Sequence, residues 1–250
     1  MTEPDAASLA RLSMTGQAKR RKVDLYGGAM SAELPAELID ASDLRQVPDY
    51  QECFVHPVHK DQSLIIELLD INDDEEGVIP TKDAGVEEIL KASIRRHFAA
   101  LDDAQGPEDT VSVETASNQT FSLETPFTVP NGGEAIRQAA ILQGTHRLQK
   151  FNEGTRKRVR VAMALVRLEA VGTELLITLF DADETAGEGG LTDDEADQQP
   201  TKKPTSPVRE AEKAQAISRW DSVLAIMQSV RILEWTLFPE YAPDGYSKWA

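Results

Sequence analysis

The chain carries D-L-Y-G-G-A-M at residues 24–30, D-A-S-D-L-R-Q-V-P-D-Y-Q-E at residues 40–52 and D-Q-S-L-I-I-E-L-L-D at residues 61–70. An extended segment is expected to begin at Leu25 and to bend at the glycine pair, because glycine tolerates conformations that other residues avoid. It ends at Pro35, which has no N–H to donate. Ser42 and Asp43 are suitable N-caps for a short helical turn. These blocks therefore predict strands and turns rather than an active site.

The third block places an acidic side chain inside an apolar strand. Strands are expected over residues 52–55 and 63–71, and the near-continuous apolar run of the second predicts burial on both faces. Glu67 and Asp70 point to opposite faces of this strand, because side chains alternate. A carboxylate within such a run requires a basic partner or a wet face. Glu67 is therefore a candidate binding residue.

The rest of the chain predicts two amphipathic helices and several antiparallel strands. We expect helices over residues 81–104, with Thr81 as N-cap, and over residues 207–233. Strands are expected over residues 110–114, 120–124, 139–151, 158–169 and 174–180, the last two joined by a hairpin at Gly172. Arg158, Arg160 and Arg167 are expected where water reaches the strand. The order of elements predicts an α+β fold: an antiparallel sheet of about six strands with an α-helix on each face.

One domain is expected over residues 24–238, between terminal segments that have little to bury. Residues 1–23 predict a disordered basic tail. Its cluster Lys19-Arg20-Arg21-Lys22 is of the kind that import receptors or acidic surfaces bind, but a basic tail that arose by chance is an equal alternative. Residues 182–207 predict a disordered acidic linker, and residues 239–250 a C-terminal tail. Leu237 and Phe238 are expected to pack back onto the domain.

Composition favours the cytosol or nucleus and a basic protein partner. The single cysteine fits a reducing compartment, and neither a membrane-spanning run nor the apolar core of a signal peptide is present. A net charge of −17 argues against nucleic acid and anionic membranes as partners. Residues 33–114 hold 21 acidic and 6 basic residues, whereas residues 134–170 hold 3 acidic and 8 basic ones. Most of these charges are expected to be ordinary solvated surface, but the first half is the side that suits a basic partner.

Catalytic motifs are missing from the sequence. No G-x-x-x-x-G-K-[ST] phosphate loop is present. His56 and His59 have a spacing that a metal could use, but no third histidine or cysteine ligand accompanies them nearby. Cys53 is expected to be a small buried apolar residue, and His97 a packing or capping residue. We therefore expect no cofactor, no metal and no enzymatic activity.

The order of elements resembles the Mog1 family, the Ran-binding nucleotide release factors of nuclear transport. The resemblance is carried by L-Y-G-G-A, L-R-Q-V-P-D-x-Q-E and S-L-I-I-E-L-L, with more generic matches at residues 97–104, 159–168 and 174–178. It implies an antiparallel sheet flanked by a helix on each side, a fold type similar to that of the PsbP proteins. It also implies a protein of nucleus and cytoplasm, expected to be a monomer, that binds Ran and promotes nucleotide release without a covalent step.

The resemblance further implies that the contact with Ran is acidic and lies around the third block. By residue match this role goes to Glu67 and Asp70, supported by a polar loop of Arg45, Gln46, Asp49, Gln51 and Glu52. Two alternatives stay open. Arg45 and Asp49 could merely pin their loop by an ion pair. The chain could also be a scaffold or chaperone that binds a basic partner without accelerating nucleotide release.

Overall fold

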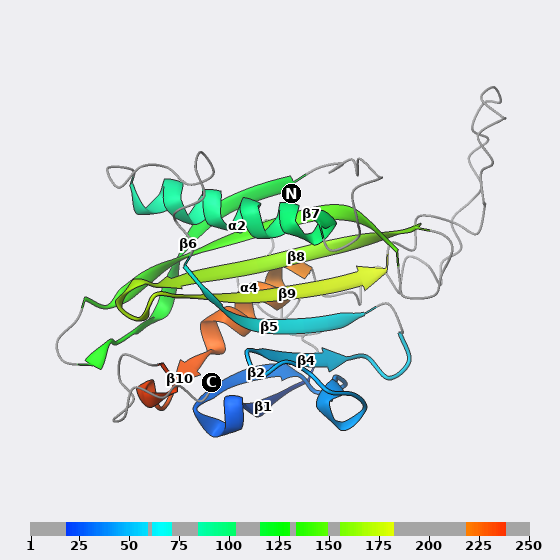
Figure 1. Cartoon of the computed structure of the whole chain (residues 1–250), viewed down its shortest axis with the longest axis horizontal. Coiled ribbons are helices and arrows are strands. Elements are labelled where there is room, and N and C mark those ends of the chain that lie inside the picture. Colours follow the sequence, from blue (N-terminus) through cyan, green and yellow to red (C-terminus); the bar gives the residue numbers. More distant parts are fainter. Residues whose placement is uncertain are drawn as a thin grey trace, which may run out of the picture.

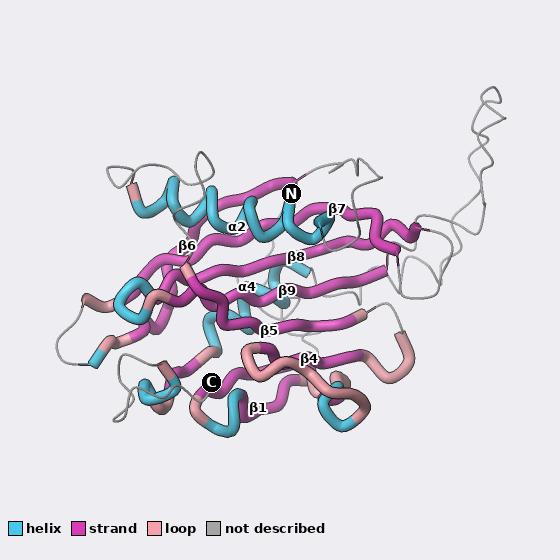
Figure 2. Tube along the Cα trace, in the orientation of Figure 1, coloured by secondary structure: helices cyan, strands magenta, loops and turns pink. Residues whose placement is uncertain are grey.

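The computed structural model describes residues 19–59, 62–71, 85–103, 116–130, 134–149, 156–182 and 219–238. Within these residues, a seven-stranded antiparallel sheet has the spatial order β3-β4-β5-β9-β8-β7-β6, and a three-stranded sheet has the order β1-β2-β10 (Figures 1 and 2). The strands of the large sheet are β3 (Ile39–Asp40), β4 (Gln51–Val55), β5 (Ser63–Asp70), β6 (Ala116–Phe127), β7 (Ile136–Gln149), β8 (Arg156–Leu168) and β9 (Thr173–Ala182). Those of the small sheet are β1 (Arg20–Leu25), β2 (Met30–Pro35) and β10 (Arg231–Ile232).

A helix packs on each face of the large sheet, as the sequence predicted. Helix α2 (Val86–Asp103) lies across β6, β7 and β8, and α4 (Arg219–Ser229) packs against the opposite face and against β2 (Figure 1). Strand β8 serves both cores, because alternate residues point to opposite faces. Its residues Val161 and Met163 belong to the core under α2, whereas Ala162 and Ala164 belong to the core under α4. The alternation accounts for a strand that is apolar on both sides.

Three expectations about the start of the domain are wrong in detail. The boundary at residue 24 falls inside β1, because residues 20–25 pair with β2 and Leu25 is fully buried. The basic cluster thus extends into a strand, while residues 1–18 lie outside the described residues. The short helical turn is Ala41–Asp43, and its N-cap is Asp40, whose Oδ1 accepts from the Ser42 N–H at 2.8 Å. The glycine bend is confirmed: Gly27 and Gly28 have φ values of +63° and +93°.

Other elements differ from the prediction mainly in extent. The sheet is larger than the expected six strands, and β5 is buried on one face and half-buried on the other rather than buried on both. The C-terminal helix ends at Ser229, because Arg231 and Ile232 pair with β2 instead of continuing the helix. Leu237 and Phe238 are buried, as expected. Thr81 and the expected strand at 110–114 lie outside the described residues, as do residues 183–218 and 239–250.

The hairpin between β8 and β9 is confirmed and contains an unexpected buried charge pair. Gly172 takes a left-handed conformation with φ +57°, after the 3-10 turn Glu169–Val171. Directly across the hairpin, Arg167 faces Glu174, and their side chains are 3.0 Å apart. Arg167 is only 7% exposed, so the expectation that water reaches it is wrong. Arg160 is half-buried, and the Arg158 side chain lies outside what the structure describes.

Glu174 joins this hairpin to helix α2. The carboxylate is fully buried and accepts from Ser93 Oγ at 2.6 Å and from Arg96 Nη2 at 2.8 Å. His97 Nε2 lies 2.6 Å from the same group, so His97 has a polar partner that the sequence did not predict. Burial raises the pKa of Glu174, but the hydrogen bonds from His97 and Ser93 and the charges of His97 and Arg96 outweigh it and hold the pKa below its ordinary value.

None of the described helices is long and apolar enough to cross a membrane.

Candidate partner-binding site

The β4–β5 ladder brings two of the predicted site residues into direct contact. Gln51 lies opposite Glu67 in the register, and Gln51 Nε2 donates to Glu67 Oε1 at 2.6 Å. Both side chains are half-buried. They share the face of the sheet on which α2 lies, since Glu67 also pairs with Leu176 of the core under that helix. Gln51 therefore fixes the orientation of the Glu67 carboxylate beside α2.

The Glu67 carboxylate occupies a place that water solvates poorly. Burial raises its pKa, while the Gln51 hydrogen bond and the charge of His97 lower it in part. Removal of a carboxylate from water is unfavourable unless a cation or donors compensate it. Gln51 and the charge of His97 thus compensate the half-buried carboxylate of Glu67 only in part, and a cationic group from a partner would improve its surroundings.

The loop before β4 extends this surface. Arg45 Nη2 approaches Cys53 Sγ at 3.6 Å, and Cys53 stands two residues after Gln51 on the same side of β4. Cys53 is 3% exposed, which confirms it as a small buried residue. Gln46 and Asp49 are exposed loop residues. Among the ion pairs of the described residues, none joins Arg45 to Asp49, so the pinning alternative gains no support.

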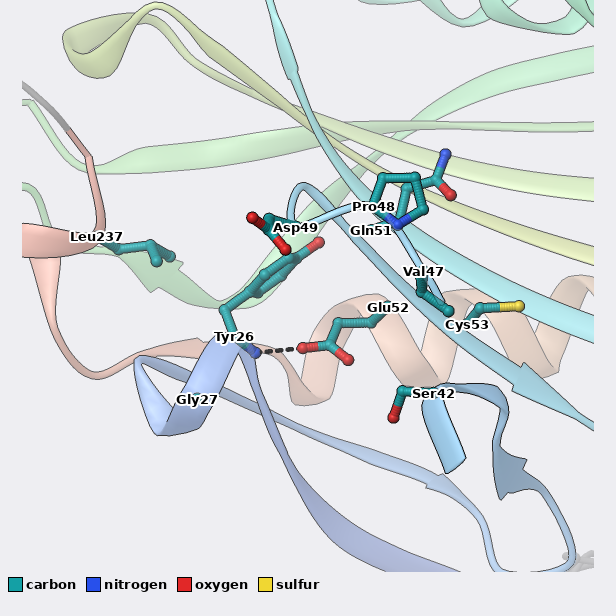
Figure 3. A pocket seen from close by; sticks show the side chains of 10 residues that line it. All are labelled: Tyr26, Gly27, Ser42, Val47, Pro48, Asp49, Gln51, Glu52, Cys53 and Leu237. Carbon is teal, nitrogen blue, oxygen red and sulfur yellow. Dashed lines mark hydrogen bonds between the residues drawn. The ribbon is translucent and has the colours of Figure 1, made fainter. Parts of the chain in front are cut away.

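Glu52 faces away from Glu67. It pairs with Ile66 on the side of the sheet that α4 covers, and its carboxylate accepts from the backbone N–H of Tyr26. Figure 3 shows the Gln51 and Glu52 side chains pointing in opposite directions from β4, with Glu52 directed at Tyr26. Burial raises the pKa of Glu52, the Tyr26 N–H lowers it, and the charge of Asp40 adds to the rise. The predicted site is therefore divided between two faces.

Asp70 stands apart from the Gln51–Glu67 pair. It is the exposed last residue of β5 and lies opposite Thr173 in the register. Because Asp70 is the third residue after Glu67, it points to the other face of the strand, as the sequence predicted. Asp70 contributes charge at the strand end rather than a direct contact with Gln51.

A surface pocket of about 330 Å³ lies between the Tyr26 turn, the loop before β4 and the C-terminal 3-10 turn Trp235–Leu237 (Figure 3). The lining residues are Tyr26, Gly27, Ser42, Val47, Pro48, Asp49, Gln51, Glu52, Cys53 and Leu237. The pocket is therefore next to the predicted loop and shares Asp49, Gln51 and Glu52 with it.

Sequence reasoning missed Tyr26 as a residue of this region. Its side chain is 7% exposed, and its hydroxyl lies 3.0 Å from the Ile66 carbonyl oxygen and 3.3 Å from that of Tyr50. The glycines that follow Tyr26 signalled a turn, but no sequence pattern indicates which carbonyls the hydroxyl reaches.

Within the described residues there is no group of three or more side chains that could hold a metal. His56 Nδ1 instead accepts from the backbone N–H of Val58 and of His59, at 3.1 and 2.9 Å.

Comparison with known proteins gives one consistent result. Residues 23–182 match the family described as Ran-interacting Mog1 protein. The chain is 39% identical over 162 residues to a human protein named Ran guanine nucleotide release factor, a match that covers 63% of this chain and 74% of that protein. It is 26% identical over 174 residues to the nuclear import protein MOG1 of Saccharomyces cerevisiae, covering 66% of this chain and 67% of that protein. The crystal structure of the S. cerevisiae Ran-binding protein Mog1p shares the fold, with a TM-score of 0.51, 19% identity, and coverage of 89% of this chain and all of that one.

Proposed function

Because the chain belongs to the Mog1 family, we propose that it binds the small GTPase Ran and promotes release of its guanine nucleotide, in support of nucleocytoplasmic protein transport. Family membership carries this proposal, since residues 23–182 match the Ran-interacting family and human, bovine and zebrafish relatives are named Ran guanine nucleotide release factors. As part of the same proposal, the protein acts in nucleus and cytoplasm.

The Gln51–Glu67 pair is the centre of the proposed Ran-binding surface. Glu67 supplies a half-buried negative charge in a fixed orientation, and the loop before β4 adds the exposed polar residues Arg45, Gln46 and Asp49. Asp70 extends the negative charge to the end of β5. A basic segment of Ran would gain hydrogen bonds here, and the complementary charge would speed association and make it sensitive to salt.

Release requires no bond to be made or broken by this chain. A protein that binds nucleotide-free Ran more tightly than loaded Ran shifts the equilibrium between these two states towards nucleotide-free Ran. The size of the shift is set by the ratio of the two affinities. The proposed activity is therefore that of a binding protein, acting as a monomer and without a cofactor.

The test is the release of a fluorescent GTP analogue from loaded Ran, with and without this protein at low and high salt. We expect Glu67→Lys combined with Asp70→Lys to slow release by about tenfold or more. Its matched control is Glu124→Lys combined with Glu134→Lys, which makes the same change in net charge at exposed residues outside the proposed surface.

Two outcomes would contradict the proposal in different ways. If the Glu67 and Asp70 double variant releases nucleotide as fast as the wild type, the binding surface is assigned wrongly. If the wild type binds Ran without accelerating release, the scaffold alternative is correct and the release activity is not.

A further inference from the structure

Tyr26 contacts the large sheet directly behind the Gln51–Glu67 pair. It lies in the 3-10 turn Tyr26–Gly28 of the small sheet, and its buried side chain reaches across to β4 and β5. Its hydroxyl is 3.0 Å from the Ile66 carbonyl oxygen and 3.3 Å from the Tyr50 carbonyl oxygen. Ile66 immediately precedes Glu67, and Tyr50 immediately precedes Gln51. One hydroxyl thus contacts the backbone of β5 and the residue directly before β4, in each case one residue before a member of the pair.

The backbone of Tyr26 provides a second connection to the same place. Its N–H donates to the carboxylate of Glu52, the residue that follows Gln51. Gln51 is therefore held on both sides, through Tyr50 and through Glu52. The Tyr50 carbonyl oxygen also accepts from the Leu68 N–H at 3.0 Å, so residues on both sides of Glu67 take part. All these contacts come from behind, while Gln51 and Glu67 face the side of α2.

Tyr26 keeps this position in spite of an unfavourable backbone conformation. Its φ is +51°, which side chains larger than glycine rarely adopt, and no other described residue except glycine has a positive φ. Such a conformation persists where surrounding contacts fix it. The hydroxyl and N–H contacts to the large sheet are contacts of that kind.

We propose that Tyr26 is a positioning residue for the Ran-binding surface, whose hydroxyl sets the alignment of β4 and β5 and so the geometry of the Gln51–Glu67 pair. The inference rests on the proposed function. A hydrogen bond of 2.6 Å between Gln51 and Glu67 leaves little room for displacement, so a small shift between the strands would weaken it.

The variant that tests this is Tyr26→Phe, which keeps the ring and removes only the hydroxyl. We expect its affinity for nucleotide-free Ran to fall about threefold to tenfold, the range of one hydrogen bond. The second readout needs no Ran: the Glu67 carboxyl is titrated by NMR in the free protein. Because the Gln51 bond lowers the pKa of Glu67, its weakening should move that pKa further up.

A matched control removes another hydroxyl far from the surface. Ser229 Oγ donates to the Ile226 carbonyl oxygen at 2.7 Å and accepts from the Glu33 N–H at 2.8 Å. Ser229→Ala should leave both the affinity for Ran and the Glu67 titration unchanged, because one of these contacts lies within α4 and the other joins α4 to β2. All variants are compared at a temperature at which thermal unfolding shows each to be fully folded.

A double-mutant cycle distinguishes positioning from general support of the fold. Gln51→Leu removes the contact that Tyr26 is proposed to align, so adding Tyr26→Phe to it should weaken Ran binding little further. Full additivity, or an unchanged Glu67 titration in Tyr26→Phe, would overturn the inference. If the wild type does not bind Ran but Tyr26→Phe shifts the titration, positioning holds and the proposed function fails.

Discussion

Replacement of Glu174 by glutamine tests whether the buried charge cluster holds helix α2 on the sheet. The carboxylate is fully buried and contacts Arg96, His97 and Arg167, while the Arg167 side chain is 6% exposed. Glutamine keeps the shape but removes the charge and turns an amide NH₂ towards groups that donate. An arginine left buried without its counter-ion costs about 3–5 kcal/mol of unfolding free energy. Glu169 lies 3.7 Å from Arg167 Nε and compensates in part, so we expect the lower end.

The stability difference between wild type and Glu174→Gln should depend on pH. The pKa of Glu174 is held below its ordinary value of 4.5. A carboxylate with a lowered pKa in the folded state stabilises the protein above its unfolded pKa, and that stability is lost as the pH falls through the folded value. The difference between wild type and Glu174→Gln should therefore be constant near neutral pH and shrink below pH 4.5.

Urea unfolding followed by tryptophan fluorescence, repeated over a series of pH values, measures this difference. The control is Glu87→Gln, which changes an exposed ion pair with Lys91 on the same helix and should have little effect. A loss below about 1 kcal/mol, or one that stays the same at acid pH, would refute the reasoning. Exchange of both Glu174 and Arg167 for leucine should cost less than the two single changes together.

Three further predictions concern other parts of the domain. Gly144→Ala would place a Cβ 2.8 Å from Phe98 Cε2, so we expect a loss of about 1–3 kcal/mol in chemical unfolding, partly restored by Phe98→Leu. Leu25→Ala should cost about 2–5 kcal/mol because β1 belongs to the core, while exposed Lys22→Ala should change the melting temperature little. Glu67→Gln should keep or raise the melting temperature at pH 7 while nucleotide release slows, because burial raises the pKa of Glu67 and so disfavours its charged form. A lower melting temperature for this variant at neutral pH, with normal release, would contradict that account.

Periodicity predicted the elements that bury an apolar face. Helix α2 and strand β8 were placed correctly because their apolar residues recur at the helical and strand periods. Strand β1 was missed because Arg20, Arg21 and Lys22 are too polar to signal a strand, and pairing with β2 decides its conformation. Local pattern contains no information about such a partner.

The same limit applies to charged residues. Arg167 was expected at the surface because arginine is rarely buried alone, yet Glu174 faces it across the hairpin. Counting outward from Gly172 would have placed Ala170, not Arg167, opposite Glu174, because the register of this hairpin is centred between Ala170 and Val171. The contact of Gln51 with Glu67 needed the register of β4 on β5, and the reach of Tyr26 needed the packing of two sheets, neither of which a single sequence specifies.

Neighbouring residues of strand β4 have different roles because their side chains lie on opposite faces of the sheet. Gln51 lies on the face of the proposed partner site, and Glu52 contacts the small sheet of the same protein. A variant found at either position would be described as a change in the same short motif. The two variants should nevertheless have different defects. A change at Gln51 should leave the protein folded but weaken partner binding, whereas a change at Glu52 should weaken the contact between the two sheets. A deletion or insertion of a single residue within β4 would move each side chain to the opposite face of the sheet. The length of this segment therefore constrains sequence variation as strongly as its residue types do.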